Sequence, residues 1–268
     1  FLYCTAAVSF CGNGLLLLLL LHRSGAALGN YRILLAAFAI TDVCISLYHT
    51  WFIPMFVLGK YGFIYYGHGS IFSKKLMSKY SNEIFSTTFY LPFFLIGIHF
   101  IYRYLSLARP SYVKEKFIGF SIFCAVYALV YNTFFALLSH AVCELGISKR
   151  FYVYLSEFER RPLTPDVNAA VVEYLDENNE INFRAIFIIL SAGAVGGHSI
   201  VISLICIFNI FRALNNKVLE ISVKRGHIQL FRALLLQFSI PFVFSFLPFA
   251  AIVSLPATGI SLGLTGDV

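Results

Sequence analysis

The residues of this sequence that could do chemistry are a few polar side chains inside long apolar segments. Asp42 interrupts the apolar segment 33–58, and Asn13 lies in a Gly-Asn-Gly break of the first segment. An ionisable residue within a membrane is costly, so it faces other helices or water and marks a functional position. We expect Asn13 to be its partner. The pair is equally compatible with a hydrogen bond that joins two helices and with an ion-binding or conformational role.

A second polar group lies at the end of the apolar segment 84–102, which Arg103 follows directly. Arg103 is predicted either to extend its side chain to the membrane surface or to act as a switch that contacts a cytoplasmic partner. His99 lies one turn earlier on the same helix face. We expect His99 to be a hydrogen-bonded packing residue, with a ligand-binding role as the alternative.

Two prolines lie seven residues apart in the last apolar segment, Pro241 and Pro248. Proline removes a backbone hydrogen bond and kinks a helix. The freed carbonyls need partners, which Gln237 and nearby serines could supply. Such a helix can act as a hinge, although a passive kink fits the pattern equally well.

Motifs of enzymes and metal sites are absent from the sequence. It contains no His-Glu-x-x-His, no Gly-x-Ser-x-Gly and no glycine-rich phosphate loop. The six cysteines show no paired spacing, and the acidic cluster 176–180 lacks the EF-hand pattern. We therefore expect no enzyme, no cofactor and no metal. The small residues 192–197 are expected to let another helix approach closely.

The composition places these residues in a membrane protein. Of the 268 residues, 59% are hydrophobic and only 12% are charged, against roughly 25% charged residues in soluble domains. This excludes a disordered chain, a disulfide-rich secreted module and an ordinary cytosolic enzyme. With lipid as the main solvent, the net charge of +7 concerns orientation, and we expect no nucleic-acid partner.

Six apolar segments are long enough to cross a membrane as helices. We therefore predict an all-α membrane protein with a single transmembrane helical domain over 1–268. The predicted spans are 1–21, 33–58, 84–102, 117–142, 185–211 and 233–255.

The loops between these spans differ in basic residues. Loops 22–32, 103–116 and 212–232 carry 11 of the 20 Lys and Arg in 46 residues, whereas loops 59–83 and 141–184 carry nine in 69 residues. Lys and Arg concentrate on the cytoplasmic side. The first set is therefore predicted to be cytoplasmic and the N-terminus outside.

These motifs, in this order, resemble the nematode seven-transmembrane chemoreceptors of the serpentine receptor class r group, of the Str and Srj types. The stretches that carry the resemblance are Gly12-Asn13, 29–35 leading to 38–42, 99–104, 230–237, Ile240-Pro241 and Leu247-Pro248.

The resemblance implies a G-protein-coupled receptor for odorants or other environmental small molecules, on the ciliary plasma membrane of sensory neurons. It implies coupling to a heterotrimeric G protein through Tyr102, Arg103, Tyr104, Lys217, Lys224 and Arg225. Tyr102-Arg103-Tyr104 takes the place of the acid-Arg-Tyr motif of rhodopsin-like receptors, with Tyr in place of the acid. The conformational core would comprise Asn13, Asp42, His99, Gln237, Pro241 and Pro248.

In a receptor, the ligand is expected in the outer half of the bundle, where aromatic residues are many. The candidate ligand-binding residues are Phe85, Thr88, Phe89, Pro92, Ile188, Ser191, Phe246 and Phe249.

The number of predicted spans and the polar residues within them allow other interpretations. Family members have a seventh helix, whereas this sequence ends at Val268 after six predicted spans, so we expect a truncated form of the bundle. The main alternative is a fragment of a transporter or channel with a polar path at Asp42 and His99. A membrane enzyme would need converging acids and histidines at one depth.

Overall fold

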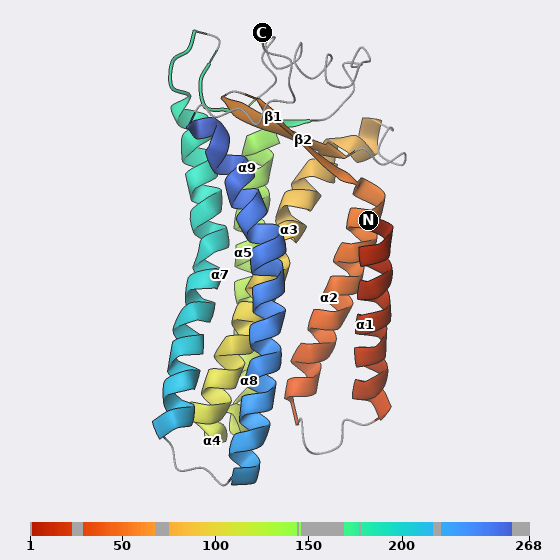
Figure 1. Ribbon diagram of the computed structural model, residues 1–268, viewed down its shortest axis with the longest axis vertical. Helices are drawn as coiled ribbons and strands as arrows, with labels where there is room; N and C mark the ends of the chain where they lie inside the picture. Colours follow the sequence, from red (N-terminus) through yellow and green to blue (C-terminus); the bar gives the residue numbers. More distant parts are fainter. Residues whose placement is uncertain are drawn as a thin grey trace.

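A bundle of long helices carries a small β-sheet at one end in the computed structural model (Figure 1). The structure describes residues 2–22, 29–59, 61–67, 75–143, 145, 169–176, 178–216 and 221–258. The helices are α1 Leu2–His22, α2 Tyr31–Phe52, α3 Lys75–Ala108, α4 Pro110–Glu115, α5 Phe117–Cys143, α7 Phe183–Asn216, α8 Ile221–Pro241 and α9 Leu247–Ala257. A π-helical turn, η2 (Phe242–Phe246), joins α8 to α9. The strands are β1 Pro54–Gly59, β2 Gly62–Gly67 and β3 Ala170–Glu173.

The helices confirm the predicted all-α membrane protein. Among the described residues, five helical stretches are long and apolar enough to cross a membrane: Tyr31–Phe52, Tyr80–Ala108, Phe117–Cys143, Phe183–Asn215 and Lys224–Ala257. The first helix adds a shorter apolar stretch, Ala6–His22. We call the end with the strands the sheet end, and the opposite end, where α4 lies, the α4 end (Figure 1).

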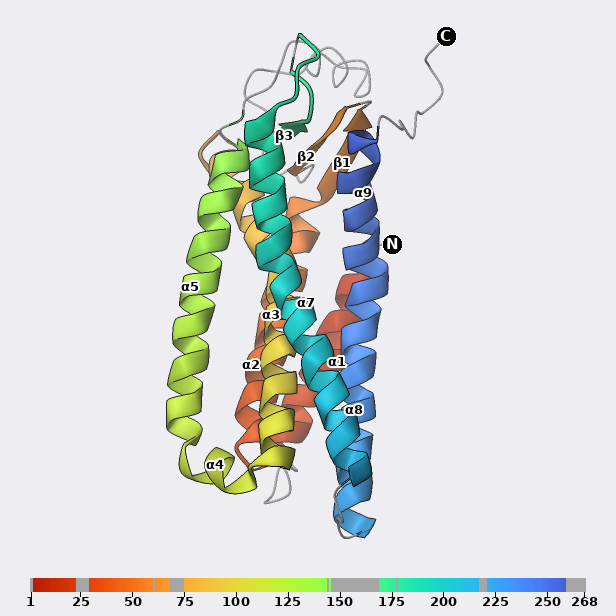
Figure 2. The same ribbon diagram turned by 90° about the vertical axis from the view of Figure 1, so that its left-hand side faces the viewer.

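Helix α3 occupies the centre of the bundle and packs against α2, α5, α7 and α8, while α1 packs on α2 (Figures 1 and 2). Its Phe93, Ile96 and Phe100 are almost fully buried against α7 and α8. Gly196 of α7 leaves space for the Tyr90 ring of α3, because a Cβ at Gly196 would lie 2.3 Å from a ring carbon. Within the small residues 192–197, Gly196 therefore accommodates an aromatic side chain.

The second predicted span, 33–58, is too long by six residues. Helix α2 ends at Phe52, where Ile53 adopts a left-handed backbone with φ 47°. Pro54 then has no N–H to continue the helix. Residues Pro54–Gly59 instead pair antiparallel with Gly62–Gly67, and β3 pairs with the other edge of β2. The apolar residues 54–58 therefore belong to a β-strand and not to the helix.

The last predicted span, 233–255, is longer in the structure. The helical segment starts at Ile221, and the chain widens into the π-turn η2 directly after Pro241. A π-turn accommodates the backbone groups that a proline leaves unpaired. Pro248 lies in the first turn of α9, directly after the π-turn and within the same continuous helical stretch.

Candidate functional site

A cavity of about 360 Å³ lies inside the bundle at the sheet end. Its walls come from α3, α5, α7, η2, α9 and all three strands. Nine of its 22 described lining residues are aromatic: Phe56, Phe63, Tyr65, Phe85, Phe89, Tyr90, Phe135, Phe246 and Phe249. Several of these rings pack on one another, as Phe89 does on Phe249 with centroids 4.8 Å apart. This mutual packing gives the cavity a preformed apolar lining.

The sheet forms the outer wall of this cavity and is tied to the helices by phenol groups. The hydroxyl oxygen of Tyr65 in β2 lies 2.6 Å from Ser86 Oγ in α3. Tyr174, which follows β3, donates a hydrogen bond to the carbonyl of Val253 in α9 at 2.8 Å. Burial raises the pKa of both tyrosines, so both hydroxyls stay protonated. The strands are therefore held against the bundle as a fixed wall.

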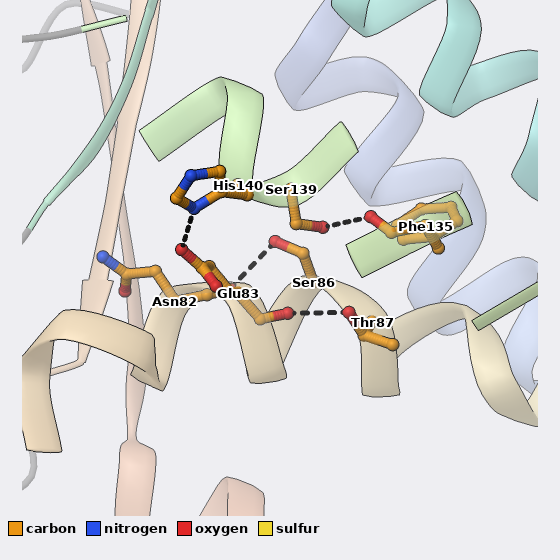
Figure 3. Close-up of polar contacts among 7 residues, drawn as sticks. All are labelled: Asn82, Glu83, Ser86, Thr87, Phe135, Ser139 and His140. Carbon is orange, nitrogen blue, oxygen red and sulfur yellow. Dashed lines mark hydrogen bonds and ion pairs between the residues drawn. The ribbon is translucent and has the colours of Figure 1, made fainter. Parts of the chain in front are cut away.

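Three serines on the cavity wall use their hydroxyl hydrogens locally. Ser86 donates to the carbonyl of Asn82 at 3.0 Å, and Ser139 to that of Phe135 at 2.9 Å (Figure 3). Ser254 donates to the carbonyl of Ala250 at 2.6 Å. None of the described residues that line the cavity carries a charge.

An ion pair joins α3 to α5 close to these serines. Glu83 Oε1 lies 2.8 Å from His140 Nδ1, and the two side chains point toward one another (Figure 3). The His140 side chain is 51% exposed and that of Glu83 18%. A pair this exposed contributes little to stability, but it connects the two helices that carry Ser86 and Ser139.

A different site lies toward the α4 end, around Arg103. Its guanidinium carbon lies 3.6 Å from the centroid of the Tyr31 ring, a cation–π geometry. The Tyr31 hydroxyl lies 3.1 Å from His99 Nδ1, and its ring stacks on Tyr102. His227 of α8 is close enough to Arg103 to interact with its charge. Arg103 is therefore half-buried between α2 and α8, with its guanidinium against the Tyr31 ring.

The guanidinium of Arg103 is incompletely paired in this position. Its Nε and Nη2 atoms are buried and have no hydrogen-bond partner within the described part of the chain. A buried donor without a partner is costly. The aromatic face of Tyr31 offsets part of that cost, and the arginine keeps two donors available for another partner.

Comparison with known proteins identifies the family. The family model described as "Serpentine type 7TM GPCR chemoreceptor Str" matches residues 1–268. The chain belongs to this family. It is also similar to serpentine receptor class r-10 of Caenorhabditis briggsae, with 20% identity over 271 residues that cover 97% of this chain and 78% of the relative. The resemblance drawn from the sequence is confirmed, and this Str-family chain is a multi-pass membrane chemoreceptor.

The cavity of this Str receptor contains four of the eight predicted ligand-binding residues. Phe85, Phe89, Phe246 and Phe249 line it. The other four are not part of its wall: Thr88, Pro92, Ile188 and Ser191. Thr88 bonds within its own helix, and Ile188 is buried in the core beneath the sheet. On α3 the residues that face the cavity are 85, 86, 89 and 90, so Thr88 and Pro92 lie on another helix face.

Sequence reasoning missed the cavity residues of the strands and of α5. These are Phe56, Phe63, Tyr65, Val172, Phe135, Leu138, Ser139 and Val142. The strand residues had a signal, because the aromatic run 63–66 lies between Gly62 and Gly67, which is typical of a strand. The residues of helix α5 had no such signal in the sequence, because the side chains of this helix are apolar on every face.

The structure describes five of the six predicted coupling residues. Tyr102 is buried against α4 and α5, and Tyr104 packs on the core around α8. Lys224 is half-buried and Arg225 exposed at the start of α8. Lys217 lies outside the described residues.

The remaining residues of the predicted conformational core lie in α1, α2 and α8. In α1, Asn13 donates to Ser9 Oγ at 3.2 Å and is a hydrogen-bond partner of Asp42 in α2. Ser46 also donates to Ser9, at 2.7 Å. Gln237 is half-buried in α8, one turn before Pro241.

The structure does not join Asp42 and His99 into a polar path, because His99 bonds Tyr31 whereas Asp42 faces Asn13. The comparisons give the transporter or channel alternative no support. Among the described residues no group of three or more His, Cys, Asp or Glu is placed to hold a metal ion.

Proposed function

We propose that this Str-family receptor detects small, uncharged, largely apolar environmental molecules, of the odorant type, in the cavity at the sheet end. The observation that carries this proposal is the preformed aromatic cavity of about 360 Å³, which is within the usual range for small-molecule sites. The absence of charge from its described lining favours uncharged ligands, because an ionised ligand would lose its hydration without gaining a counter-ion.

The receptor is proposed to lie in the ciliary plasma membrane of sensory neurons, with its N-terminus and the sheet outside. The concentration of Lys and Arg in the loops at the α4 end supports this orientation. The cavity then lies on the side from which environmental molecules arrive, and Arg103 on the side of the G protein.

A chain of stacked aromatic rings is proposed to connect the two sites. Phe246 lines the cavity and stacks on Phe242, which stacks on Phe238 one turn farther along the helix. Phe238 in turn contacts Phe100 of α3 edge-on. Because η2 lies within this series of stacked rings, a ligand that shifts Phe246 would also shift the rings of η2 and α8.

The response at the α4 end is proposed to be the release of Arg103 from Tyr31. When α8 moves relative to α3, the cation–π contact is exchanged for contacts with a heterotrimeric G protein. Lys224 and Arg225 at the start of α8 are proposed to add positive charge for this contact. Lys217, also proposed to take part in coupling, lies outside the described residues.

The test is G-protein activation by receptors with single arginine changes. Arg103→Ala is expected to abolish coupling while surface expression persists, because it removes the proposed contact. The matched control is Arg184→Ala, which removes an exposed arginine at the sheet end and should leave coupling intact. Normal coupling by Arg103→Ala would contradict the proposal.

A further inference from the structure

The hydroxyl groups of the cavity wall have one chemical property in common. A serine hydroxyl has one hydrogen to donate and two lone pairs that accept. Ser86, Ser139 and Ser254 each donate that hydrogen to the carbonyl four residues earlier in their own helix, at 3.0, 2.9 and 2.6 Å. Toward the cavity these three groups therefore have only lone pairs left.

The contact between Tyr65 and Ser86 follows the same rule. The two oxygens lie 2.6 Å apart, and one of them must donate. Because the hydrogen of Ser86 is used by the Asn82 carbonyl, Tyr65 is the donor. A phenol is also the more acidic of the two hydroxyls. Both oxygens then keep unused lone pairs in the corner where β2 meets α3.

The rest of the described lining contributes almost no other donors. Apart from Tyr90 and the hydroxyls above, its side chains are Phe, Leu, Val, Ile, Ala or Gly. The backbone N–H groups of the helices that surround the cavity are engaged in helical hydrogen bonds. The hydroxyl of Tyr90 is the remaining side-chain donor on the described wall.

We infer that the cavity selects uncharged ligands that donate a hydrogen bond, namely alcohols and phenols, over ketones and ethers of the same size. This inference rests on the proposed function, since it assumes that the cavity is the ligand site. An alcohol can donate to the lone pairs of Ser86 or Tyr65. A ketone or ether would place its own lone pairs against them and leave its oxygen without a partner.

The experiment compares matched pairs of probes on the purified full chain in lipid nanodiscs. The pairs are cyclohexanol with cyclohexanone and para-ethylphenol with its isomer para-methylanisole. Binding is measured by ligand-induced thermal stabilisation. One hydrogen bond in an apolar site predicts about tenfold tighter binding of the donor in each pair. Equal binding, a preference for the ketone or ether, or no binding of any probe overturns the inference.

Two neighbouring residues of α3 provide matched variants. Ser86→Ala removes a hydroxyl from the cavity wall, whereas Thr87→Ala removes one that bonds the Glu83 carbonyl in the same way, at 2.8 Å, and is not part of the wall (Figure 3). Ser86→Ala should lower phenol binding about tenfold. It should not lower anisole binding, because the Tyr65 hydroxyl then loses its acceptor and can donate to the ether oxygen. Thr87→Ala should change neither. Identical effects of the two variants contradict the inference.

Tyr90→Phe tests the remaining donor. If Tyr90 donates to ligands, this change weakens binding of cyclohexanone and para-methylanisole selectively, and the inference is overturned. The expected result is that the ketone and ether bind Tyr90→Phe as weakly as they bind the unaltered receptor.

G-protein activation by the same probes separates the inference from the proposed function. Selective binding without activation would refute the receptor function proposed for the cavity and leave the selectivity intact. Activation by both members of each pair at equal concentrations would refute the selectivity and leave the receptor function intact.

Discussion

The cavity at the sheet end and the Arg103 site toward the α4 end treat their polar groups in opposite ways. In the cavity the hydroxyls of Ser86, Ser139 and Ser254 all donate within their own helices. At the other site, two nitrogens of Arg103 are buried without a partner among the described residues, and its guanidinium lies over the Tyr31 ring. Satisfied polar groups favour one rigid arrangement, whereas an unsatisfied group favours any rearrangement that supplies a partner. The comparison suggests a fixed binding site and a movable switch in the same bundle.

The largest expected effect concerns the rigidity of the cavity wall. In Gly196→Ala the new Cβ would lie 2.3 Å from a carbon of the Tyr90 ring. The ring is buried and cannot move aside freely, so we expect a loss of about 1–3 kcal/mol in stability. Thermal unfolding of the purified receptor measures it. Gly197→Ala is the control, because its Cβ meets nothing within 4 Å. Equal stability of the two variants would show that the wall is more adaptable than we propose.

The second effect concerns the switch. Tyr31→Leu removes the aromatic ring beneath Arg103, and a desolvated cation–π contact is worth about 1–2 kcal/mol. We expect basal G-protein activation to rise about five- to thirtyfold, as measured in cells without ligand.

Tyr31→Phe provides the matched variant, since it keeps the ring and loses only the hydroxyl, with its contacts to His99 and Arg103. Its basal activation should stay near the unaltered level. A rise as large as that of Tyr31→Leu would assign the restraint to the hydroxyl of Tyr31 and not to its ring.

A smaller effect is expected where the sheet meets the bundle. Tyr65→Phe removes the hydrogen bond to Ser86, a change of about 0.5–1.5 kcal/mol. Amide hydrogens of β2 should exchange with solvent several-fold faster, as followed by hydrogen–deuterium exchange. Tyr112→Phe, an exposed tyrosine in α4, should have no such effect. Unaltered exchange in β2 would mean that ring packing and the Tyr174 hydrogen bond hold the sheet without the Tyr65 hydroxyl.

The smallest effect is expected at the ion pair that joins α3 to α5. Glu83→Gln removes its charge, and because His140 is 51% exposed we expect a loss of at most about 1 kcal/mol. The loss should shrink in high salt, which screens exposed charges. Thermal unfolding at low and high salt checks this. A large, salt-independent loss would reveal a structural role that the exposure of the pair does not predict.

The sequence was sufficient for the helices and the family, but less so for the site. Long uncharged segments locate the helices, because crossing a membrane requires a minimum apolar length. The bounds agree closely for 117–142 and α5 at Phe117–Cys143, but less closely for 84–102 and α3 at Lys75–Ala108. The strands were missed since 54–58 continues an apolar run, and only the backbone break at Ile53 and Pro54 separates them. On α3, Phe85 and Phe89 were predicted, but Ser86 and Tyr90 were not.

By itself the sequence determined that this chain is a membrane-spanning helical receptor of the Str family, because apolar length and ordered motifs are properties of the chain. The tertiary structure decided which faces of those helices line the cavity and which residue holds Arg103. Tyr31 and His99 are 68 positions apart and no spacing links them. In helices that are apolar on every side, only packing against neighbours sets the rotation of each helix, and that rotation decides which side chains meet.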